Sequence, residues 1–279
     1  MERRLVEGVA VREHGDPAAP GVLMWPGLGS TSAYFDAVAE AMPGRAVAVD
    51  PPGFGGSSPL EPCTTERLVE LADSVIGACG CQAMVGHSLG AYLAVAVAAD
   101  PPAGLRAIVL IDGGYLNVDE MVALGQPPTS AGRSELIAWL RQHRLRFPDW
   151  ETAIRAVAEM IFASNVTPEL EAYLRAELVE VDGEIWDPAS PERMADLLIA
   201  ARSRDVPSLA RYIAIPTLLI ACAKQQLEHR ALAESAWQRF AGASPQIDLH
   251  VAETWGHNPI LQDPEAASRL IADWLRTHA

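Results

Sequence analysis

Residues 81–99 read Cys-Gln-Ala-Met-Val-Gly-His-Ser-Leu-Gly-Ala-Tyr-Leu-Ala-Val-Ala-Val-Ala-Ala. A short apolar run ends in Gly86-His-Ser88-Leu-Gly90 and passes directly into an alanine-rich segment with high helix propensity. The order strand, tight turn, helix is the context in which a Gly-x-Ser-x-Gly sequence holds a reactive serine. Gly86 and Gly90 let the strand and the helix approach closely, and the helix N-terminus favours negative charge beside Ser88. We therefore predict that Ser88 is a nucleophile exposed on a strained turn.

The composition limits the classes of protein to which the chain can belong. Its 279 residues can bury the core of one α/β domain with an inserted subdomain. Apolar residues make up 49% and charged residues 20%, as in an ordinary globular protein. The formal net charge of −15 argues against nucleic-acid and membrane partners, because anionic partners are bound by basic surfaces. The sequence contains no apolar stretch of signal or membrane-spanning length, so a cytoplasmic location is expected.

Metal and cofactor sites are not indicated by the sequence. The four cysteines lack the spacing of a metal site, and reduced thiols are expected. No pair of histidines or carboxylates four residues apart on one helix has a third ligand in view, so no metal is expected. The phosphate-binding and dinucleotide-binding glycine motifs do not occur in their structural context, so no cofactor is expected either. The expected partner is a small-molecule substrate, and the oligomeric state is not indicated.

Apolar strands and amphipathic helices alternate over the first part of the chain and again near its end. This alternation predicts a largely parallel sheet that is covered by helices on both faces. Besides the run that ends at Gly86, strands are predicted over 21–25, 45–50, 105–111, 215–221 and 246–251, with an edge strand or hairpin over 5–14. Besides the helix after Gly90, helices are predicted over 32–42, 66–78, 227–240 and 265–276, the second of them capped by Thr64.

The alternation stops between about residues 115 and 207. This block contains no convincing strand, and its helical segments cover 134–146, 150–164, 168–179 and 191–204. We expect one helical insertion that forms a lid over a cleft. The predicted division is therefore a core of residues 1–114 and 208–279 with a lid of residues 115–207.

Four local sequences occur in a characteristic order. They are Pro26-Gly-Leu-Gly29, Asp50-Pro-Pro-Gly-Phe-Gly-Gly-Ser57, Gly86-His-Ser-Leu-Gly90 and the late Gly256-His257. In these motifs, and in the strand order between them, the chain resembles the α/β-hydrolase superfamily over nearly its whole length. The resemblance implies the α/β-hydrolase fold, which is a mostly parallel central sheet flanked by helices, with a helical lid inserted after the strand that follows residues 89–99.

The resemblance also implies a role for each matching residue. Ser88 would be the nucleophile that forms an acyl intermediate. His257 would be the base that deprotonates Ser88 and later the acid that protonates the leaving group. The oxyanion hole would consist of the backbone amides of Leu28 and Leu89. Their side chains matter little to this role, because it is the main chain that donates.

Two further residues are expected to shape the site rather than to react. His87 precedes the serine, as is common in the superfamily, and is expected to pack against the turn or to orient it. Pro26 stands where relatives usually have a histidine in the oxyanion loop. Proline still allows the amides of the residues that follow it to point inward, so the change affects the shape of the loop rather than the hole itself.

The sequence leaves the acid of the triad open. The turn after the strand at 215–221 reads Cys222-Ala-Lys-Gln-Gln226, without the carboxylate that usually follows this strand. Asp112, at the end of the preceding strand, is the preferred replacement, because some members of the superfamily place their acid there and the order Ser–Asp–His is kept. Glu228 is the alternative acid, and a protein without a true acid is a third alternative. Asp50 is expected to fix its own turn instead.

The expected activity is hydrolysis of an ester, thioester or lactone through a Ser-His-Asp triad and an acyl-enzyme intermediate. A serine at the turn argues against epoxide and haloalkane chemistry, for which relatives use aspartate. Hydrolysis of a carbon–carbon bond beside a ketone stays open, and so does a non-hydrolytic protein of this fold, either a ligand receptor or a cyclase. Aromatic side chains in the lid give a mild preference for a small, largely apolar substrate, although such residues more often form the core of a lid. These aromatic residues are Trp139, Phe147, Trp150, Phe162, Tyr173 and Trp186.

Overall fold

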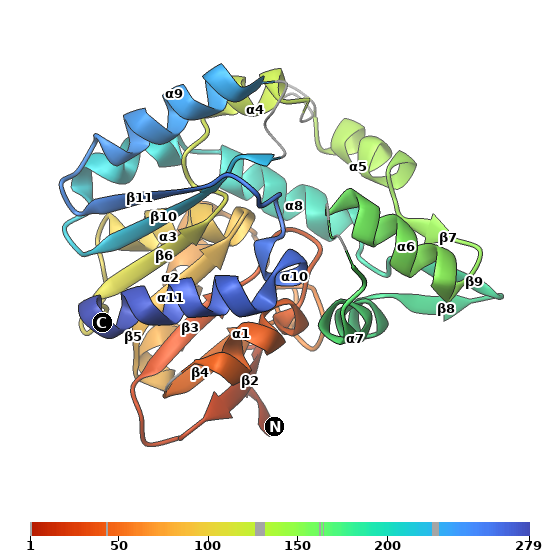
Figure 1. Cartoon of the computed structure of the whole chain (residues 1–279), viewed down its shortest axis with the longest axis horizontal. Coiled ribbons are helices and arrows are strands. Elements are labelled where there is room, and N and C mark those ends of the chain that lie inside the picture. Colours follow the sequence, from red (N-terminus) through yellow and green to blue (C-terminus); the bar gives the residue numbers. More distant parts are fainter. Residues whose placement is uncertain (1, 43, 126–131, 162, 164, 225–228) are drawn as a thin grey trace.

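A computed structural model of the chain describes residues 2–42, 44–125, 132–161, 163, 165–224 and 229–279. Its centre is a sheet in the strand order β1-β2-β4-β3-β5-β6-β10-β11 (Figure 1). The pairs β1–β2 and β2–β4 are antiparallel, and the strands from β4 to β11 in this order are parallel. The predicted α/β-hydrolase fold is confirmed. The strands are β1 (Glu2–Val6), β2 (Val9–Gly15), β3 (Gly21–Trp25), β4 (Arg45–Val49), β5 (Cys81–His87), β6 (Ala107–Ile111), β10 (Thr217–Cys222) and β11 (Ile247–Ala252).

The central strands are apolar because both of their faces are covered. Every residue of β3, β6 and β10 is buried, as expected of parallel strands between two layers of helices. One face packs against α2 (Thr65–Cys79), α3 (Leu89–Ala98) and α9 (Arg230–Ala241). The other packs against the 3₁₀ turn η1 (Ser32–Phe35), α1 (Asp36–Ala41) and α11 (Pro264–His278). The sheet is thereby held as a rigid platform between two apolar layers.

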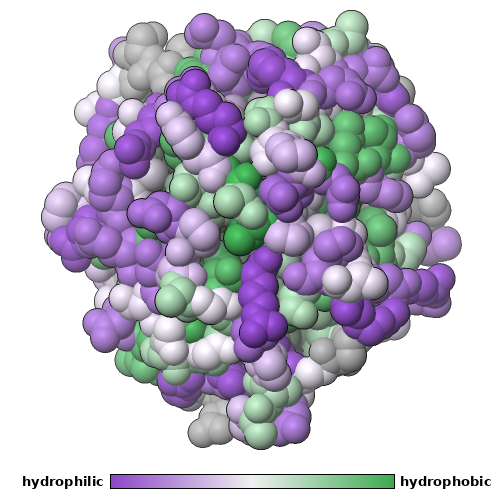
Figure 2. Space-filling view, turned by 90° about the vertical axis from the view of Figure 1, so that its left-hand side faces the viewer, coloured by the Kyte–Doolittle hydropathy of each residue, from purple (hydrophilic) through white to green (hydrophobic). Residues whose placement is uncertain are grey.

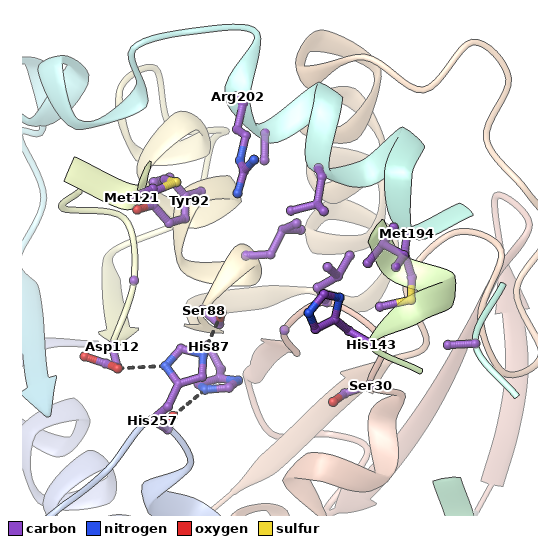
Figure 3. A pocket seen from close by; sticks show the side chains of 18 of the residues that line it. Ser30, His87, Ser88, Tyr92, Asp112, Met121, His143, Met194, Arg202 and His257 are labelled. Carbon is purple, nitrogen blue, oxygen red and sulfur yellow. Dashed lines mark hydrogen bonds and ion pairs between the residues drawn. The ribbon is translucent and has the colours of Figure 1, made fainter. Parts of the chain in front are cut away.

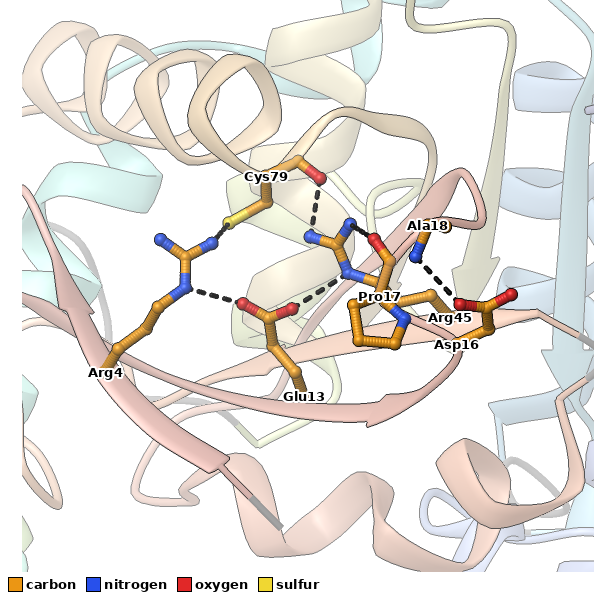
Figure 4. A network of polar contacts seen from close by, with 7 residues as sticks. All are labelled: Arg4, Glu13, Asp16, Pro17, Ala18, Arg45 and Cys79. Carbon is orange, nitrogen blue, oxygen red and sulfur yellow. Dashed lines mark hydrogen bonds and ion pairs between the residues drawn. The ribbon is translucent and has the colours of Figure 1, made fainter.

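A polar network fixes the antiparallel edge of the sheet (Figure 4). The carboxylate of Glu13 on β2 accepts hydrogen bonds from Arg4 Nε at 2.7 Å and from Arg45 Nε at 2.9 Å. Arg45 also donates to the carbonyl oxygen of Cys79 at 2.7 Å. Since these residues come from β1, β2, β4 and the end of α2, the network ties the edge strands to the helix that packs on them.

Between β6 and β10 the chain forms a block of helices and short strands. Its helices are α4 (Val118–Ala123), α5 (Arg133–Gln142), α6 (Trp150–Met160), α7 (Pro168–Glu177) and α8 (Pro191–Arg202), followed by the 3₁₀ turn η2 (Val206–Tyr212). The block meets the core through α7 against η1 and through α8 against α3 (Figure 1).

The expectation that this block lacks strands is wrong. The strands β7 (Arg146–Phe147), β9 (Glu184–Trp186) and β8 (Val179–Val181) form a small antiparallel sheet. Strands β8 and β9 form a hairpin whose turn is Asp182-Gly183. The two residues of this turn have positive φ angles of 52° and 82°. An Asp-Gly pair between short alternating segments is a strong hairpin signal, because its two residues tolerate this conformation. The helices predicted over 134–146 and 168–179 accordingly end earlier than expected.

The surface carries most of the polar side chains. Figure 2 shows one face of the molecule, on which hydrophilic side chains are interspersed with smaller hydrophobic areas.

Among the helices of the described residues, none combines the length and the apolar character that crossing a membrane requires.

Candidate active site

Ser88 lies on the turn between β5 and α3, with φ 52° and ψ −115°. These angles are unfavourable for a residue with a side chain, and such strain is typical of functional sites. The turn is possible because its flanking residues lack side chains. A Cβ atom on Gly86 would lie 2.3 Å from the carbonyl oxygen of Gly90, and one on Gly90 would lie 2.1 Å from that of Trp25. The strained turn that the sequence predicts is therefore present.

The side chain of His257 lies between Ser88 and Asp112 (Figure 3). It comes from the loop between β11 and α10 (Pro259–Gln262). Its Nε2 is 2.9 Å from Ser88 Oγ, and its Nδ1 is 2.7 Å from Asp112 Oδ2. Because a carboxylate only accepts, Nδ1–H donates to Asp112, and this leaves Nε2 to accept the proton of the Ser88 hydroxyl.

Asp112 directly follows β6 and is held on several sides. Its Oδ1 accepts hydrogen bonds from the hydroxyl of Tyr115 at 2.9 Å and from the amide of Cys222 at 3.1 Å. Its side chain is 1% exposed, whereas that of His257 is 39% exposed. Cys222 ends β10, the strand after which the usual acid would stand. Asp112 thus reaches its position from the neighbouring strand, and Glu228, the alternative acid, lies outside the described residues.

Asp50, the remaining carboxylate at a strand end, faces a different part of the structure. Its Oδ1 accepts a hydrogen bond from the amide of Ser32 at 2.9 Å, and its Oδ2 accepts one from the amide of Gly56 at 2.8 Å. It is fully buried under the loop that follows β4. Asp50 therefore fixes its own turn, as the sequence predicts.

His87 supports the main chain of His257. Its Nε2–H donates to the carbonyl oxygen of His257 at 2.7 Å, and its ring stacks on Tyr34 with centroids 4.5 Å apart. Burial, and then the neighbouring His257, hold the pKa of His87 well below its usual range. The ring is therefore neutral at ordinary pH, and it positions the loop that carries His257. The sequence indicates a packing role for His87 but not which residue it contacts.

The two predicted oxyanion residues, Leu28 and Leu89, both line the cavity beside Ser88. Leu89 is the first residue of α3, where a backbone N–H has no partner within the helix. Leu28 follows β3, and both leucines line the same cavity as Ser88. A Cβ atom on Gly27 would lie 3.1 Å from Ser88 Cβ, so the loop of Leu28 packs tightly against the serine.

The loop that carries Leu28 is tied to α7. Glu177 accepts hydrogen bonds from the backbone N–H of Thr31 at 2.9 Å and from its hydroxyl at 2.5 Å. The hydroxyls of Ser30 and Tyr173 are 3.0 Å apart. Burial raises the pKa of Glu177 to about 7, although the bonds from Thr31 act in the opposite direction. Helix α7 thereby contacts the loop next to the serine through a carboxyl group whose pKa lies near neutral pH.

A cavity of about 450 Å³ opens beside Ser88 and extends under α5 and α8 (Figure 3). Its apolar wall includes Leu116, Leu140, Met194 and Leu198. Polar groups also reach it, chiefly His143, Arg144, Asp187 and Arg202. Sequence reasoning did not single out Arg202 or Tyr92, which line the cavity from two helices. No local pattern marks them, because their place depends on how α8 packs on the core.

The cysteines and the acidic residues offer no metal centre in the part of the chain that the structure describes. There, no group of three His, Cys, Asp or Glu side chains comes together as a metal site would require. The four cysteines are free thiols, and burial raises the pKa of Cys63 to about 11 and that of Cys81 to about 12. These two thiols are therefore protonated at ordinary pH.

The chain is similar to known proteins over nearly all of its length. A 2-succinyl-6-hydroxy-2,4-cyclohexadiene-1-carboxylate synthase from Klebsiella pneumoniae subsp. pneumoniae is 24% identical over 282 residues, covering 95% of this chain and 98% of the relative. A 2-(acetamidomethylene)succinate hydrolase from Mesorhizobium japonicum is 28% identical over 278 residues, covering 95% of this chain and 90% of the relative.

Solved structures share the fold. The crystal structure of an E-2-(acetamidomethylene)succinate hydrolase superposes with a TM-score of 0.73 at 21% sequence identity, covering 99% of each chain. The family model described as the alpha/beta hydrolase family matches residues 22–270, from the second residue of β3 into α11. With the sheet order, the serine turn and this match together, the chain belongs to the alpha/beta hydrolase family.

Proposed function

We propose that this protein is a serine hydrolase that cleaves an ester, thioester or lactone of a small substrate. Ser88 is the nucleophile, His257 is the general base and acid, and Asp112 is the acid that orients His257. One observation carries the proposal. A continuous chain of contacts runs from Asp112 Oδ2 to His257 Nδ1 at 2.7 Å and from His257 Nε2 to Ser88 Oγ at 2.9 Å. Such a chain gives a serine hydroxyl a base that is held in the required tautomer.

The reaction has two halves. His257 Nε2 takes the hydroxyl proton as Ser88 Oγ attacks the substrate carbonyl, and the negative charge that develops on the carbonyl oxygen is stabilised by the amides of Leu28 and Leu89. The imidazolium then gives its proton to the leaving group. Water enters, His257 deprotonates it, and attack on the acyl group returns Ser88 to its starting state.

Residues 115–207 act in this proposal as a lid over the core formed by residues 1–114 and 208–279. Its helices α5 and α8 supply much of the wall of the cavity beside Ser88. A volume of about 450 Å³ suits a small molecule, and the leucine and methionine side chains favour an apolar segment in the substrate.

A second candidate is supported by one of the relatives. The relative that is 24% identical is named a synthase rather than a hydrolase, which makes non-hydrolytic chemistry a second candidate for this chain. Cleavage of a carbon–carbon bond beside a ketone is a related alternative. In each of these cases simple esters would be poor substrates.

Hydrolysis of p-nitrophenyl butyrate separates these candidates. We expect turnover by the wild-type chain, with a burst of p-nitrophenol when acylation is faster than deacylation. Ser88→Ala should lower kcat by about ten thousandfold or more, because the nucleophile is lost. Ser74→Ala is the matched control, since Ser74 is exposed on α2, and it should leave kcat unchanged. Absence of turnover in the wild type, or undiminished turnover in Ser88→Ala, would refute the proposal.

A further inference from the structure

Arg202 is a buried cation in the wall of the cavity beside Ser88. It is the last residue of α8 and is 9% exposed. Its side chain extends from the helix toward the interior of the cavity, next to Tyr92 (Figure 3). Removing a guanidinium from water costs several kcal/mol unless anionic or hydrogen-bonding groups offset that cost. Because its side chain reaches the cavity, its N–H donors can also meet a molecule bound there.

The helix end explains only part of this placement. A positive side chain in the last turn of a helix interacts favourably with the helix dipole, and an exposed arginine does this equally well. Arg202 instead turns inward, where burial lowers its pKa and the nearby Tyr92 acts in the opposite direction. The guanidinium remains charged in proteins and has five N–H donors in one plane, enough to bind the protein and a ligand together.

The neighbouring polar groups of the cavity are engaged with one another. Arg144 Nε donates to the carbonyl oxygen of Asp187 at 2.7 Å. Burial raises the pKa of the Asp187 carboxyl, against the hydrogen bond from the Ala189 amide and the charge of Arg144. His143 Nδ1 lies 2.8 Å from the carbonyl oxygen of Trp139, and its ring stacks on the indole. Arg202 adds a further positive charge to the wall of the same cavity.

The overall charge makes this local cation more significant. A net charge of −15 repels small anions from the surface at long range. An anionic ligand consequently needs a positive group inside the cavity to be held there. The same wall also contains the apolar side chains of Leu89, Leu116 and Leu198.

We propose that Arg202 binds a carboxylate of the substrate, which makes the substrate an acid with a reactive carbonyl at one end and a free carboxylate at the other. The planar guanidinium matches the two oxygens of a carboxylate. A short apolar chain joins the two ends and lies along the leucine side chains. This inference rests on the proposed function, because it takes the reactive carbonyl of the substrate to lie at Ser88.

Binding to a Ser88→Ala chain tests the inference without turnover. Calorimetric titrations would compare the monomethyl esters of succinic, glutaric and adipic acid with the corresponding dimethyl esters. Each pair differs in one free carboxylate, and the three chain lengths span a range of distances from the carbonyl. At least one monoester should bind about ten to a hundred times more tightly than its diester, as expected for a charge-assisted hydrogen-bonded pair.

Substitutions of Arg202 test whether this residue causes the preference for the monoester. Arg202→Gln in the Ser88→Ala background should bring the monoester and its diester to within about twofold of each other, and Arg202→Lys should keep an intermediate preference because it retains the charge. Arg204→Gln is the matched control, because Arg204 is an exposed arginine two residues further along that pairs with Glu66 at 3.3 Å. It should keep the full preference. A purely structural role of Arg202 would weaken both esters of a pair equally.

Two results would overturn the carboxylate site. One is equal binding of monoester and diester at all three chain lengths, including no binding at all. The other is a preference that persists in Arg202→Gln. Labelling of the wild-type chain by a fluorophosphonate reports separately on Ser88. A labelled serine without a carboxylate preference leaves the proposed function standing and rejects this inference, whereas a preference without labelling does the reverse.

Discussion

The Nδ1 atom of His257 lies 2.7 Å from Oδ2 of Asp112, although 145 positions separate the two residues in the chain. Asp112 follows β6 and His257 follows β11, and the contact is possible because β6, β10 and β11 are parallel and adjacent, so their carboxyl ends meet at one edge of the sheet. Asp112 follows β6 with a φ of 44°, and the amide of Cys222 at the end of β10 donates to its second oxygen. The carboxylate is thus supplied by one strand and oriented by the next.

Asp112→Asn should lower kcat on p-nitrophenyl butyrate by about a thousandfold to ten thousandfold. The amide nearly preserves the shape of the side chain, but it no longer holds Nδ1–H or stabilises the imidazolium. Steady-state kinetics would measure this loss, and KM should change little. An Asp112→Asn chain with wild-type kcat would show that another group orients His257.

Glu228→Gln is the matched variant for the alternative acid. If Asp112 is the acid, Glu228→Gln should keep kcat within about twofold of the wild type, because the substitution then removes no member of the triad. The same kinetic assay applies. A loss in Glu228→Gln comparable to that expected of Asp112→Asn would transfer the role to Glu228.

His87→Phe should impair the site by releasing the main chain of His257. Phenylalanine keeps a ring against Tyr34 but cannot donate to the His257 carbonyl, and a buried acceptor left without its partner costs about 1–3 kcal/mol. We expect kcat to fall by roughly tenfold or more while KM stays near the wild-type value, because the base is displaced and the cavity is not. Equal loss in kcat and gain in KM would indicate a general disturbance instead.

The stability of the protein should depend on pH through Glu177. Its pKa is about 7 in the folded chain and near 4.5 when unfolded, so the folded state binds more protons between these values. The contribution of Glu177 is therefore fully present below about pH 4.5 and is lost as the pH rises through about 7. The total change amounts to about 3 kcal/mol in the free energy of unfolding.

Urea denaturation of the wild type and of Glu177→Gln between pH 5 and 8.5 would measure this contribution. Glutamine keeps an oxygen that can accept from Thr31 but carries no charge. The free energy of unfolding of the wild type minus that of the variant should fall with rising pH. Taking this difference removes the effects of the titrating groups that both chains share. A difference that is flat across this range would contradict the raised pKa of Glu177.

Gly90→Ala should destabilise the fold by about 3 kcal/mol or more, since the added Cβ would lie 2.1 Å from the carbonyl oxygen of Trp25 and backbone cannot move aside cheaply. Gly77→Ala is the matched control, because Gly77 lies within α2 with no atom within 4 Å of the added Cβ. It should stabilise the chain by about 0.5–1 kcal/mol through higher helix propensity. Thermal or urea unfolding of both variants would measure the difference, and a tolerated Gly90→Ala would contradict the close packing of the turn.

Much of the fold could be predicted from the sequence because its signals are local. The Gly86–Gly90 turn, the buried strands and the helix capped by Thr64, whose hydroxyl accepts from the amide of Arg67 at 3.3 Å, all follow from short patterns. The hairpin at Asp182-Gly183 also has a local signal, but the segments around it have helical periodicity, which conflicts with the signal of the turn.

The site could be predicted only in part. Ser88, His257 and the two leucines predicted to form the oxyanion hole lie in motifs, and all of them line one cavity with Asp112. Which carboxylate meets His257 depends on the backbone angle after β6 and on the neighbouring strand, and neither is readable from residue types. The contact of His87 with the His257 carbonyl and the inward turn of Arg202 depend likewise on tertiary packing.

The central claim is that His257 activates Ser88 as a nucleophile, and covalent labelling tests it most directly. The intact wild-type chain would be treated with a fluorophosphonate, its mass measured, and the modified residue located by peptide mass spectrometry. We predict one adduct, on Ser88, which is abolished in Ser88→Ala and strongly slowed in His257→Ala, and which forms normally in Ser74→Ala. A wild-type chain that stays unmodified, or an adduct on any other residue, would contradict the claim.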